Sequence, residues 1–390
     1  MRWAALLLAL GACTEVRDGV TGTQSLRVEL VSPADPGSPD NRLPDTQRDV
    51  VVNITALDAD GATDATFNNE VAIYAQFLGT LTPSLGAPPL ASATLSSGVA
   101  QNVMITLPTA YGPTTLWIDD DAAATPTYAT GTSPTLWFRD PFIVDLQKPT
   151  DEMALDALSS SPLEDKQISV NSSRYGANGR LVVTSVFAQG FTVSDVQCAA
   201  GGAPPCTTEA YNHALVFSFS APRDQNGHIV QEGEVITGFA GGLSEFNGLT
   251  EIGFPQTFAD DNAEVDPARE PQPAVLDPVT WFNGLSDPQG EINFERNEAA
   301  PIAVLNGKVC DLDDEYVTFK QWKLDPTGAG GDCSQKSNVV NIITTGIAGV
   351  DPEALVGTTL AKVVGVVRPV SIGSFNVWII FPRSPADVQQ

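Results

Sequence analysis

The chain has only two histidines, which restricts the acid–base chemistry available to it. His213 begins a predicted strand and His228 lies in a predicted loop, and neither falls in a recognisable catalytic motif. The sequence contains no GxSxG, HExxH or phosphate-binding loop, and no GxGxxG in its strand-and-helix context. Both histidines are therefore interpreted as structural or exposed, and no catalytic residue is predicted.

Paired carboxylates could hydrolyse a glycosidic bond without histidine. The densest acidic cluster within a predicted module is Asp311, Asp313, Asp314 and Glu315, and Glu245 and Glu251 form a second candidate pair. The chain carries 47 acidic residues, so such clusters arise by chance. Nothing in the sequence fixes the separation that a glycosidase needs, which favours solvated loops or strand edges.

Calcium is the metal for which the acidic loops of the sequence offer candidates, because oxygen-rich loops of exported proteins often bind it weakly. Asp58 and Asp60 lie in DADG, and Asp119 and Asp121 lie in IDDDA. Neither segment has the spacing of an EF-hand loop. A hairpin turn explains DADG better, since Asp and Gly supply the backbone geometry that a tight turn requires.

Aromatic residues on predicted strands are the candidates for a ligand-binding face. Phe217 and Phe219 are two residues apart and therefore share one face of their strand. Packing in the core is the alternative for all of these rings. The predicted ligand-contacting residues are Phe187, Phe191, Phe217, Phe219, Trp322 and Trp378.

The first thirteen residues, MRWAALLLALGAC, combine one Arg, an apolar run and small residues before a cysteine. They read as an export signal. Leu10 to Cys13 resembles the lipobox of bacterial lipoproteins, in which the cysteine becomes the lipid-modified N-terminus. That resemblance implies lipidation at Cys13, and the Thr14 that follows it favours the outer membrane.

Five cysteines cannot all pair within one chain, and a lipid-modified Cys13 leaves four. Pairing Cys198 with Cys206 and Cys310 with Cys333 closes short loops within single modules. We therefore expect two local disulfides and an oxidising compartment. A zinc site is the alternative, but the cysteines lack CxxC spacing and the chain has only two histidines.

Charge narrows the range of partners. Lys and Arg total 20 against 47 Asp and Glu, for a formal net charge of −27. Binding to DNA or RNA depends on basic residues that neutralise phosphates, so nucleic acid is not expected as a partner. The excess negative charge is interpreted as a means of staying soluble after export.

Short β-rich runs separated by turn signals predict an all-β protein of three modules. The first runs over residues 26–146, after a signal peptide (1–13) and a tether (14–25). The stretch VVVNITALDADGATDATFNNEVAIYAQ, with GPTTLWIDDD after it, resembles bacterial immunoglobulin-like modules. That resemblance implies a β-sandwich with Trp117 near its core. Residues 147–167 are polar and are expected to form a linker.

Residues 168–290 and 291–390 are each expected to form a β-barrel. Both resemble the oligonucleotide- and oligosaccharide-binding (OB-fold) modules that accompany bacterial extracellular nucleases. In the second module the matching positions are Gly190, Phe191, Asp195, Gly233, Glu245, Phe246, Gly248, Thr250 and Glu251. In the third they are a G-V-V-R strand and the ending PRSPADV. The second and third modules would then be a diverged internal pair.

Together these features predict a cell-surface lipoprotein that binds, adheres or acts as a scaffold and performs no catalysis. Its expected partners are the outer membrane, through the lipid anchor, and an unidentified protein or saccharide. Two alternatives stay open: a carbohydrate-binding module protein, and a divergent extracellular hydrolase or its accessory subunit. An aromatic cluster exposed on one module would favour saccharide or peptide binding, whereas carboxylates meeting a histidine in a cleft would favour an enzyme.

Overall fold

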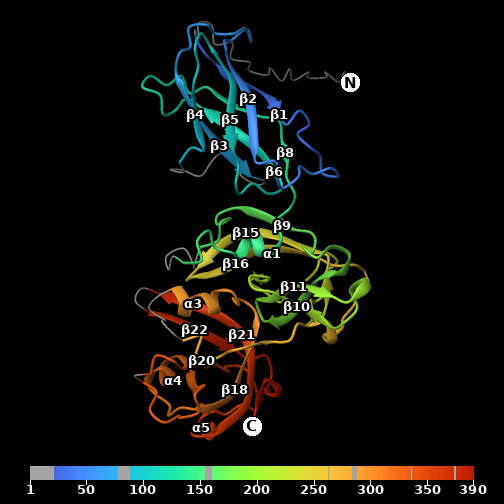
Figure 1. Cartoon of the computed structure of the whole chain (residues 1–390), viewed down its shortest axis with the longest axis vertical. Coiled ribbons are helices and arrows are strands. Elements are labelled where there is room, and N and C mark those ends of the chain that lie inside the picture. The colour runs from blue at the N-terminus through green and yellow to red at the C-terminus, as the bar shows by residue number, and fades with distance from the viewer. Residues whose placement is uncertain are drawn as a thin grey trace, which may run out of the picture. The chain divides into compact units, whose positions relative to one another are not determined.

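A computed structural model describes residues 22–77, 88–153, 160–261, 263–282, 288–334, 336–372 and 375–390. Strands make up most of the regular structure, so the prediction of a mainly β protein is confirmed (Figure 1). The chain divides into two compact units, with the boundary between Trp137 and Phe138 and with residues 109–113 belonging to the second unit. Cys13 lies outside the described residues.

The first unit consists of two sheets (Figure 1). One has the strand order β1-β2-β5, and the other has the order β4-β3-β6-β7 with β8 beside β6. Alternate residues of β2, namely Val50, Val52 and Ile54, are fully buried, as expected for a strand with one face on a core. The strands are β1 (Ser25–Ser32), β2 (Asp49–Leu57), β3 (Glu70–Phe77), β4 (Ala91–Thr94), β5 (Val99–Thr106), β6 (Pro113–Asp119), β7 (Thr130–Thr132) and β8 (Leu136–Trp137).

The second unit contains two further sheets. Strands β9–β16 and their connections are called the second module here, with the order β14-β10-β11-β13-β16-β15-β9 and β12 beside β11. Its strands are β9 (Gln167–Val170), β10 (Gly179–Phe187), β11 (Gly190–Cys198), β12 (Cys206–Thr207), β13 (His213–Phe217), β14 (Val235–Ile236), β15 (Gly238–Phe246) and β16 (Leu249–Phe258). Helix α1 (Ile143–Gln147) packs Ile143 and Leu146 into the core of this module.

Strands β17–β23, with helices α3 to α5, are called the third module. Five of its strands close into a barrel in the order β18-β19-β20-β22-β21, because β21 pairs back onto β18. The strands are β17 (Ala274–Val275), β18 (Pro301–Val309), β19 (Gln321–Asp325), β20 (Val340–Ile343), β21 (Thr359–Ile372), β22 (Phe375–Phe381) and β23 (Val388–Gln389). The helices are α3 (Pro288–Glu295), α4 (Asp314–Phe319) and α5 (Pro352–Leu355).

The two modules share one strand order but differ in closure. In the second module β10-β11-β13-β16-β15 follows the same path. In each module the third and fourth strands of this path pair in parallel: β13 with β16, and β20 with β22. In the third module the single strand β18 pairs with both β19 and β21. In the second module the corresponding strand is broken: β9 pairs with β15, and β10 pairs with β11.

Within the described residues only the third module closes through strand pairing, so the expectation of two closed barrels is corrected to one. The break in the second module lies at residues 171–178, NSSRYGAN, which contain a short 3-10 helix and Gly176 at φ +59°. This polar, turn-forming segment interrupts the ladder that closure requires.

The outward face of the second module is covered by the third. Leu215, next to the core residue Val216 on β13, packs with Leu249 and with Ala299 from the segment 296–301. Arg383 of the third module donates a hydrogen bond from Nη1 to the carbonyl oxygen of Thr184, at 2.8 Å. The two modules therefore share a packed interface.

Both predicted disulfides are present: Cys198 pairs with Cys206 and Cys310 pairs with Cys333. Two disulfides indicate a protein that folds in an oxidising, extracytoplasmic compartment. Of the residues expected to form a linker, Gln147, Ser161 and Leu163 are buried, and 154–159 lie outside the described residues. In the part of the chain that the structure describes, no helix is both long and apolar enough to cross a membrane.

Candidate ligand-binding surface

A β-bulge in the second module turns one aromatic side chain outward. Between β15 and β16, Gly242 pairs with Gly253 and Ala240 pairs with Gln256, so Phe254 and Pro255 together face the single residue Gly241. Pro255 has no N–H to give to the ladder, which suits it to a bulge. Bulges of this kind redirect side chains and occur often beside functional sites.

Phe254 is held in an unfavourable conformation and an unfavourable environment. Its φ is +49°, in the left-handed region that costs a bulky L-residue roughly 1–2 kcal/mol. Its side chain is 83% exposed to solvent. The fold therefore maintains a strained backbone while leaving a large apolar ring in water, a combination that points to function more than to stability.

Two more rings join Phe254. Phe219 follows β13, also has a positive φ (+57°) and is 53% exposed. Its ring centroid lies 4.8 Å from that of Phe254 and 4.5 Å from that of Phe217, the latter in an edge-to-face arrangement. Phe217, Phe219 and Phe254 are called the phenylalanine cluster below. Parallel pairing of β13 with β16 creates it, because Phe217 lies beside Gly253.

The cluster is anchored on its inner side. Phe187 and Phe217 pack against the small buried group formed by Leu215, Leu249 and Ala299. Phe187 also stacks under the guanidinium of Arg368, which lies 4.3 Å from the ring centroid. Phe217 is thus fixed by packing on its inner side and supports the exposed ring of Phe219.

Every residue directly adjacent in sequence to the three rings is uncharged: Val216, Ser218, Ser220, Gly253 and Pro255. The backbone N–H of Ser218 donates to the carbonyl oxygen of Gln189, and the hydroxyl of Ser218 donates to the carbonyl oxygen of Ser220. Along the chain, the exposed rings are therefore flanked by neutral residues.

The predicted ring residues divide into three groups. Phe217 and Phe219 come together in the cluster, while Phe187 and Trp378 are half-buried. Phe191 and Trp322 are fully buried core residues, and rings without an exposed face cannot contact a ligand. Sequence reasoning missed Phe254. The available signal was Phe-Pro inside a strand pattern, which marks a bulge.

The two histidines differ in their burial and in their partners. His213 is buried, and its Nδ1 lies 2.7 Å from the hydroxyl oxygen of Ser194, which is itself fully buried. Burial lowers the pKa of His213 to about 3, so the ring is neutral. His228 is exposed and lies 3.3 Å from a carboxylate oxygen of Asp224. The interpretation of both histidines as structural or exposed agrees with this geometry.

Glu245 and Glu251, which the sequence suggested as a pair, interact with different partners. Glu251 lies near Arg368, whereas Glu245 accepts a hydrogen bond from the hydroxyl of Thr250. Glu298 accepts from the backbone N–H of the same Thr250. Burial raises the pKa of Glu245 to about 7. Burial and then the charge of Glu245 also raise the pKa of Glu298, which is only 3% exposed.

The acidic cluster at 311–315 has structural partners. The Asp313 side chain accepts hydrogen bonds from the backbone N–H groups of Glu315 and Tyr316, capping α4. Asp313 and Glu315 both pair with Lys323. Ion pairs of this kind are typical of carboxylates with a structural role.

The calcium candidates also have other roles. Asp58 Oδ1 accepts from the backbone N–H groups of Asp60 and Ala62, which makes DADG a turn. Asp119 accepts from the indole of Trp117 and from the backbone N–H of Asp121. Among the described residues, no three His, Cys, Asp or Glu side chains come together as a metal site.

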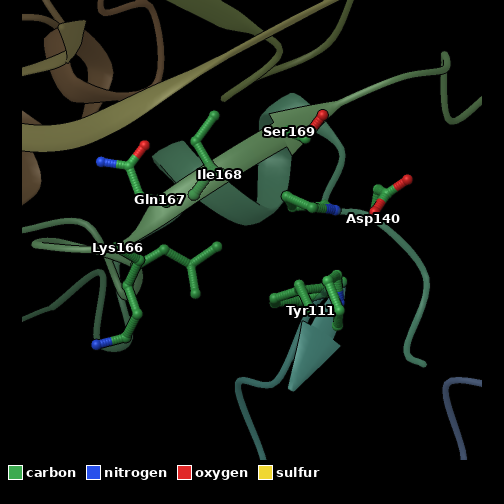
Figure 2. Close-up of a pocket in the computed structure, with 10 residues that line it drawn as sticks. Tyr111, Asp140, Lys166, Gln167, Ile168 and Ser169 are labelled. Atoms are coloured by element: carbon green, nitrogen blue, oxygen red, sulfur yellow. The ribbon is translucent and has the colours of Figure 1, made fainter. Parts of the chain in front are cut away.

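A small pocket lies beside α1 and β9, lined by Tyr111, Asp140, Lys166 and Ser169 among others (Figure 2). Its volume is about 20 Å³, which is enough for one water molecule. It is therefore too small to be the main ligand site. No family model and no curated protein sequence matches this chain.

Proposed function

We propose that this chain is an exported, non-catalytic binding protein and that the phenylalanine cluster is its ligand-contacting surface. The observation that carries this proposal is Phe254, which is strained, exposed and placed by a bulge. Water-exposed apolar rings rarely gather in a monomeric protein without a partner. Covering these rings with a ligand would be favourable, because it would remove their apolar surface from water.

An uncharged saccharide is the ligand class that fits this surface best. Aromatic rings stack against the C–H faces of sugars, and the flanking serines offer hydroxyl partners at the rim. The three rings have uncharged sequence neighbours, in a chain with a net charge of −27. A polyanion would be repelled by that charge, which argues against nucleic acid.

The location of this activity would be the bacterial cell surface. The two disulfides support export, and the resemblance of Leu10 to Cys13 to a lipobox supports a lipid anchor at Cys13. Detergent-phase partitioning tests the anchor: we expect the full chain to enter the detergent phase when made in a bacterium. The Cys13→Ser variant should stay in the aqueous phase.

The architecture supports the finer fold assignments in this proposal. We assign the third module to the OB-fold, whose five-strand barrel has the order observed here, and the second module to an opened version of it. We assign the first unit, with its two sheets, to the immunoglobulin-like sandwiches. Both folds are common carriers of binding surfaces.

The test is affinity electrophoresis of the mature chain through gels containing neutral polysaccharides, with a glycan array to identify the sugar. We expect retardation that the double variant Phe219→Ala/Phe254→Ala abolishes. Phe246→Ala is the matched control, because Phe246 is 61% exposed in the same module but outside the cluster. Retardation that survives the double variant would overturn the assignment of the cluster. Binding to proteins alone would replace the saccharide with a protein partner.

A further inference from the structure

The open face of the closed barrel holds a pocket of about 250 Å³, separate from the phenylalanine cluster. Strands β19, β20 and β22 form its floor, and helix α3 forms one wall. Ligand pockets typically have volumes of about 300–1,000 Å³, so this cavity is near the lower end and suits a small ligand. The chemistry of its lining decides which ligand it would take.

One side of the pocket is aromatic. The rings of Phe294 and Trp378 stack with centroids 5.6 Å apart and planes 18° apart. Phe282 meets Phe294 edge to face at 5.6 Å. Phe294 is 3% exposed and anchors the group, whereas Phe282 and Trp378 are half-buried and line the cavity.

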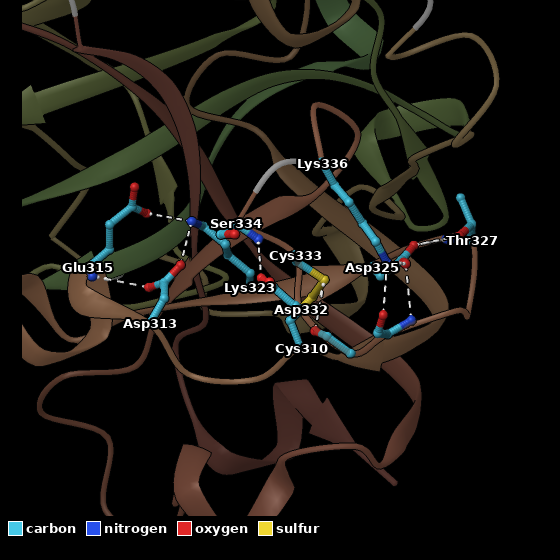
Figure 3. Close-up of a disulfide and its surroundings, with 12 residues drawn as sticks. Cys310, Asp313, Glu315, Lys323, Asp325, Thr327, Asp332, Cys333, Ser334 and Lys336 are labelled. Carbon is cyan, nitrogen blue, oxygen red and sulfur yellow. Dashed lines mark hydrogen bonds and ion pairs between the residues drawn. A yellow bond between two sulfur atoms is a disulfide. The ribbon is translucent and has the colours of Figure 1, made fainter.

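Two lysines also line the pocket, and their charges are already balanced (Figure 3). Lys323 Nζ lies 2.7 Å from Asp313 Oδ2 and 3.0 Å from Glu315 Oε2. Lys336 Nζ lies 2.8 Å from Asp325 Oδ2 and donates to the carbonyl oxygen of Gly330. The disulfide between Cys310 and Cys333 ties down the segment that carries Lys336 (Figure 3). Neither lysine is a free anion-binding group.

Glu291 is the unbalanced charge in the lining. It projects from α3, is half-buried, and has no hydrogen bond or ion pair within the part of the chain that the structure describes. Burial raises the pKa of this carboxyl, as expected for a group that loses water without gaining a partner. A cation entering the pocket would supply the missing partner.

We propose that this pocket binds an organic ammonium group, with the Glu291 carboxylate as its counter-ion and the rings of Phe282 and Trp378 as its apolar wall. Aromatic faces attract alkylammonium ions through the ring quadrupole, most strongly where water is excluded. A metal ion fits poorly, because calcium needs six to eight oxygen ligands and Glu291 is the one carboxylate here without a partner. An anion would face lysines that already have carboxylate partners.

Isothermal titration calorimetry of the full chain with choline chloride tests this inference. The control ligand is 3,3-dimethylbutan-1-ol, which has the shape of choline without its charge. We expect choline to bind at least tenfold more tightly than the alcohol. Equal affinities, or no heat with choline, would overturn the proposal.

Two variants separate the contributions to binding. Glu291→Gln keeps the shape of the side chain and removes its charge, so choline affinity should fall about tenfold. Trp378→Leu should lower it severalfold through the lost ring. Glu353→Gln, an exposed glutamate on α5, is the matched control and should bind choline as the parent chain does. Unaltered choline affinity in Glu291→Gln, with its fold verified by circular dichroism, would contradict the role of this carboxylate.

Two further measurements test the selectivity of the pocket and its independence from the proposed saccharide surface. Sodium acetate should give no heat; acetate binding that Lys336→Met abolishes would show an anion site and sink the proposal. The Phe219→Ala/Phe254→Ala variant should bind choline normally, since the two sites share no residue. A loss of choline binding in that variant would contradict a separate site.

Discussion

The second and third modules arrange five strands in the same order, yet one face is buried and the other is open. At corresponding places next to core residues, Leu215 of β13 packs beneath Ala299, whereas Asn341 of β20 lines the pocket of about 250 Å³. The third module thus covers this part of the second module's sheet. The exposed rings of the second module therefore lie at the margin of its covered face. The comparison shows that strand order alone does not decide which face of a module stays open.

The two modules also differ in whether their strands close into a barrel, and a short segment accounts for this difference. A continuous β18 closes the third barrel, whereas the NSSRYGAN segment breaks the corresponding strand of the second module. The second module compensates by packing α1 and the third module around its sheet. We expect the stability of the second module to depend on its neighbours, while the third module depends on its own ladder and disulfide.

The largest expected effect comes from removing the disulfides one at a time. The Cys198–Cys206 loop spans 8 residues and the Cys310–Cys333 loop spans 23. Chain-entropy arguments give losses of about 2.5 and about 3.4 kcal/mol in the free energy of unfolding. Urea denaturation of the two Cys→Ala pair variants would measure both values. A larger loss in the second module would contradict the loop-length argument.

The buried carboxylates between the modules should make stability depend on pH. Burial raises the folded pKa of Glu245 from 4.5 to about 7, so the folded state holds a proton that the unfolded state has lost in this window. Stability should therefore fall by up to about 3 kcal/mol as pH rises from about 4.5 to above 7. Urea midpoints at pH 5 and pH 8 test this.

Glu298→Gln provides the second arm of the pH experiment, because Glu298 shares Thr250 with Glu245 and belongs to the covering segment. The neutral amide should reduce the dependence of stability on pH and stabilise the chain at pH 8. A pH dependence that is as steep in Glu298→Gln as in the parent chain would place its origin elsewhere.

Removing the contact that covers the second module should have a moderate effect. Leu215→Ala should lower the free energy of unfolding by about 2 kcal/mol, near the low end for buried leucines, because its buried group is small. Val317→Ala, an exposed residue of α4, should change stability by less than about 0.5 kcal/mol. Equal effects of the two substitutions would mean that the covering contact contributes little.

The smallest expected change in stability is also the most specific. Phe254→Gly relieves a left-handed φ and should raise the free energy of unfolding by about 0.5 kcal/mol, after the entropic cost of glycine. Phe246→Gly, at an exposed residue without a positive φ, should lower it by about 0.5–1 kcal/mol. Thermal melts of both variants decide the sign. A clear loss of stability in Phe254→Gly would show that this ring stabilises the fold.

The sequence by itself determined the features that depend on local patterns. Alternating apolar residues and frequent turn signals gave the mainly β architecture, and cysteine spacing gave both disulfides. The same reasoning placed DADG in a turn. These properties follow from neighbours along the chain, whose chemistry is visible in the sequence.

Only the tertiary structure decided which rings are exposed and which charges lack partners. Phe191 and Phe217 look alike in sequence, yet one is in the core and the other supports an exposed cluster, because burial depends on strands distant along the chain. The bulge at Phe254 appears only when β15 and β16 are paired. Likewise, Glu291 is set apart because α3 places it over an aromatic pocket, with no hydrogen bond or ion pair among the described residues. Strand pairing and packing across the chain set these contacts, and no local pattern encodes them.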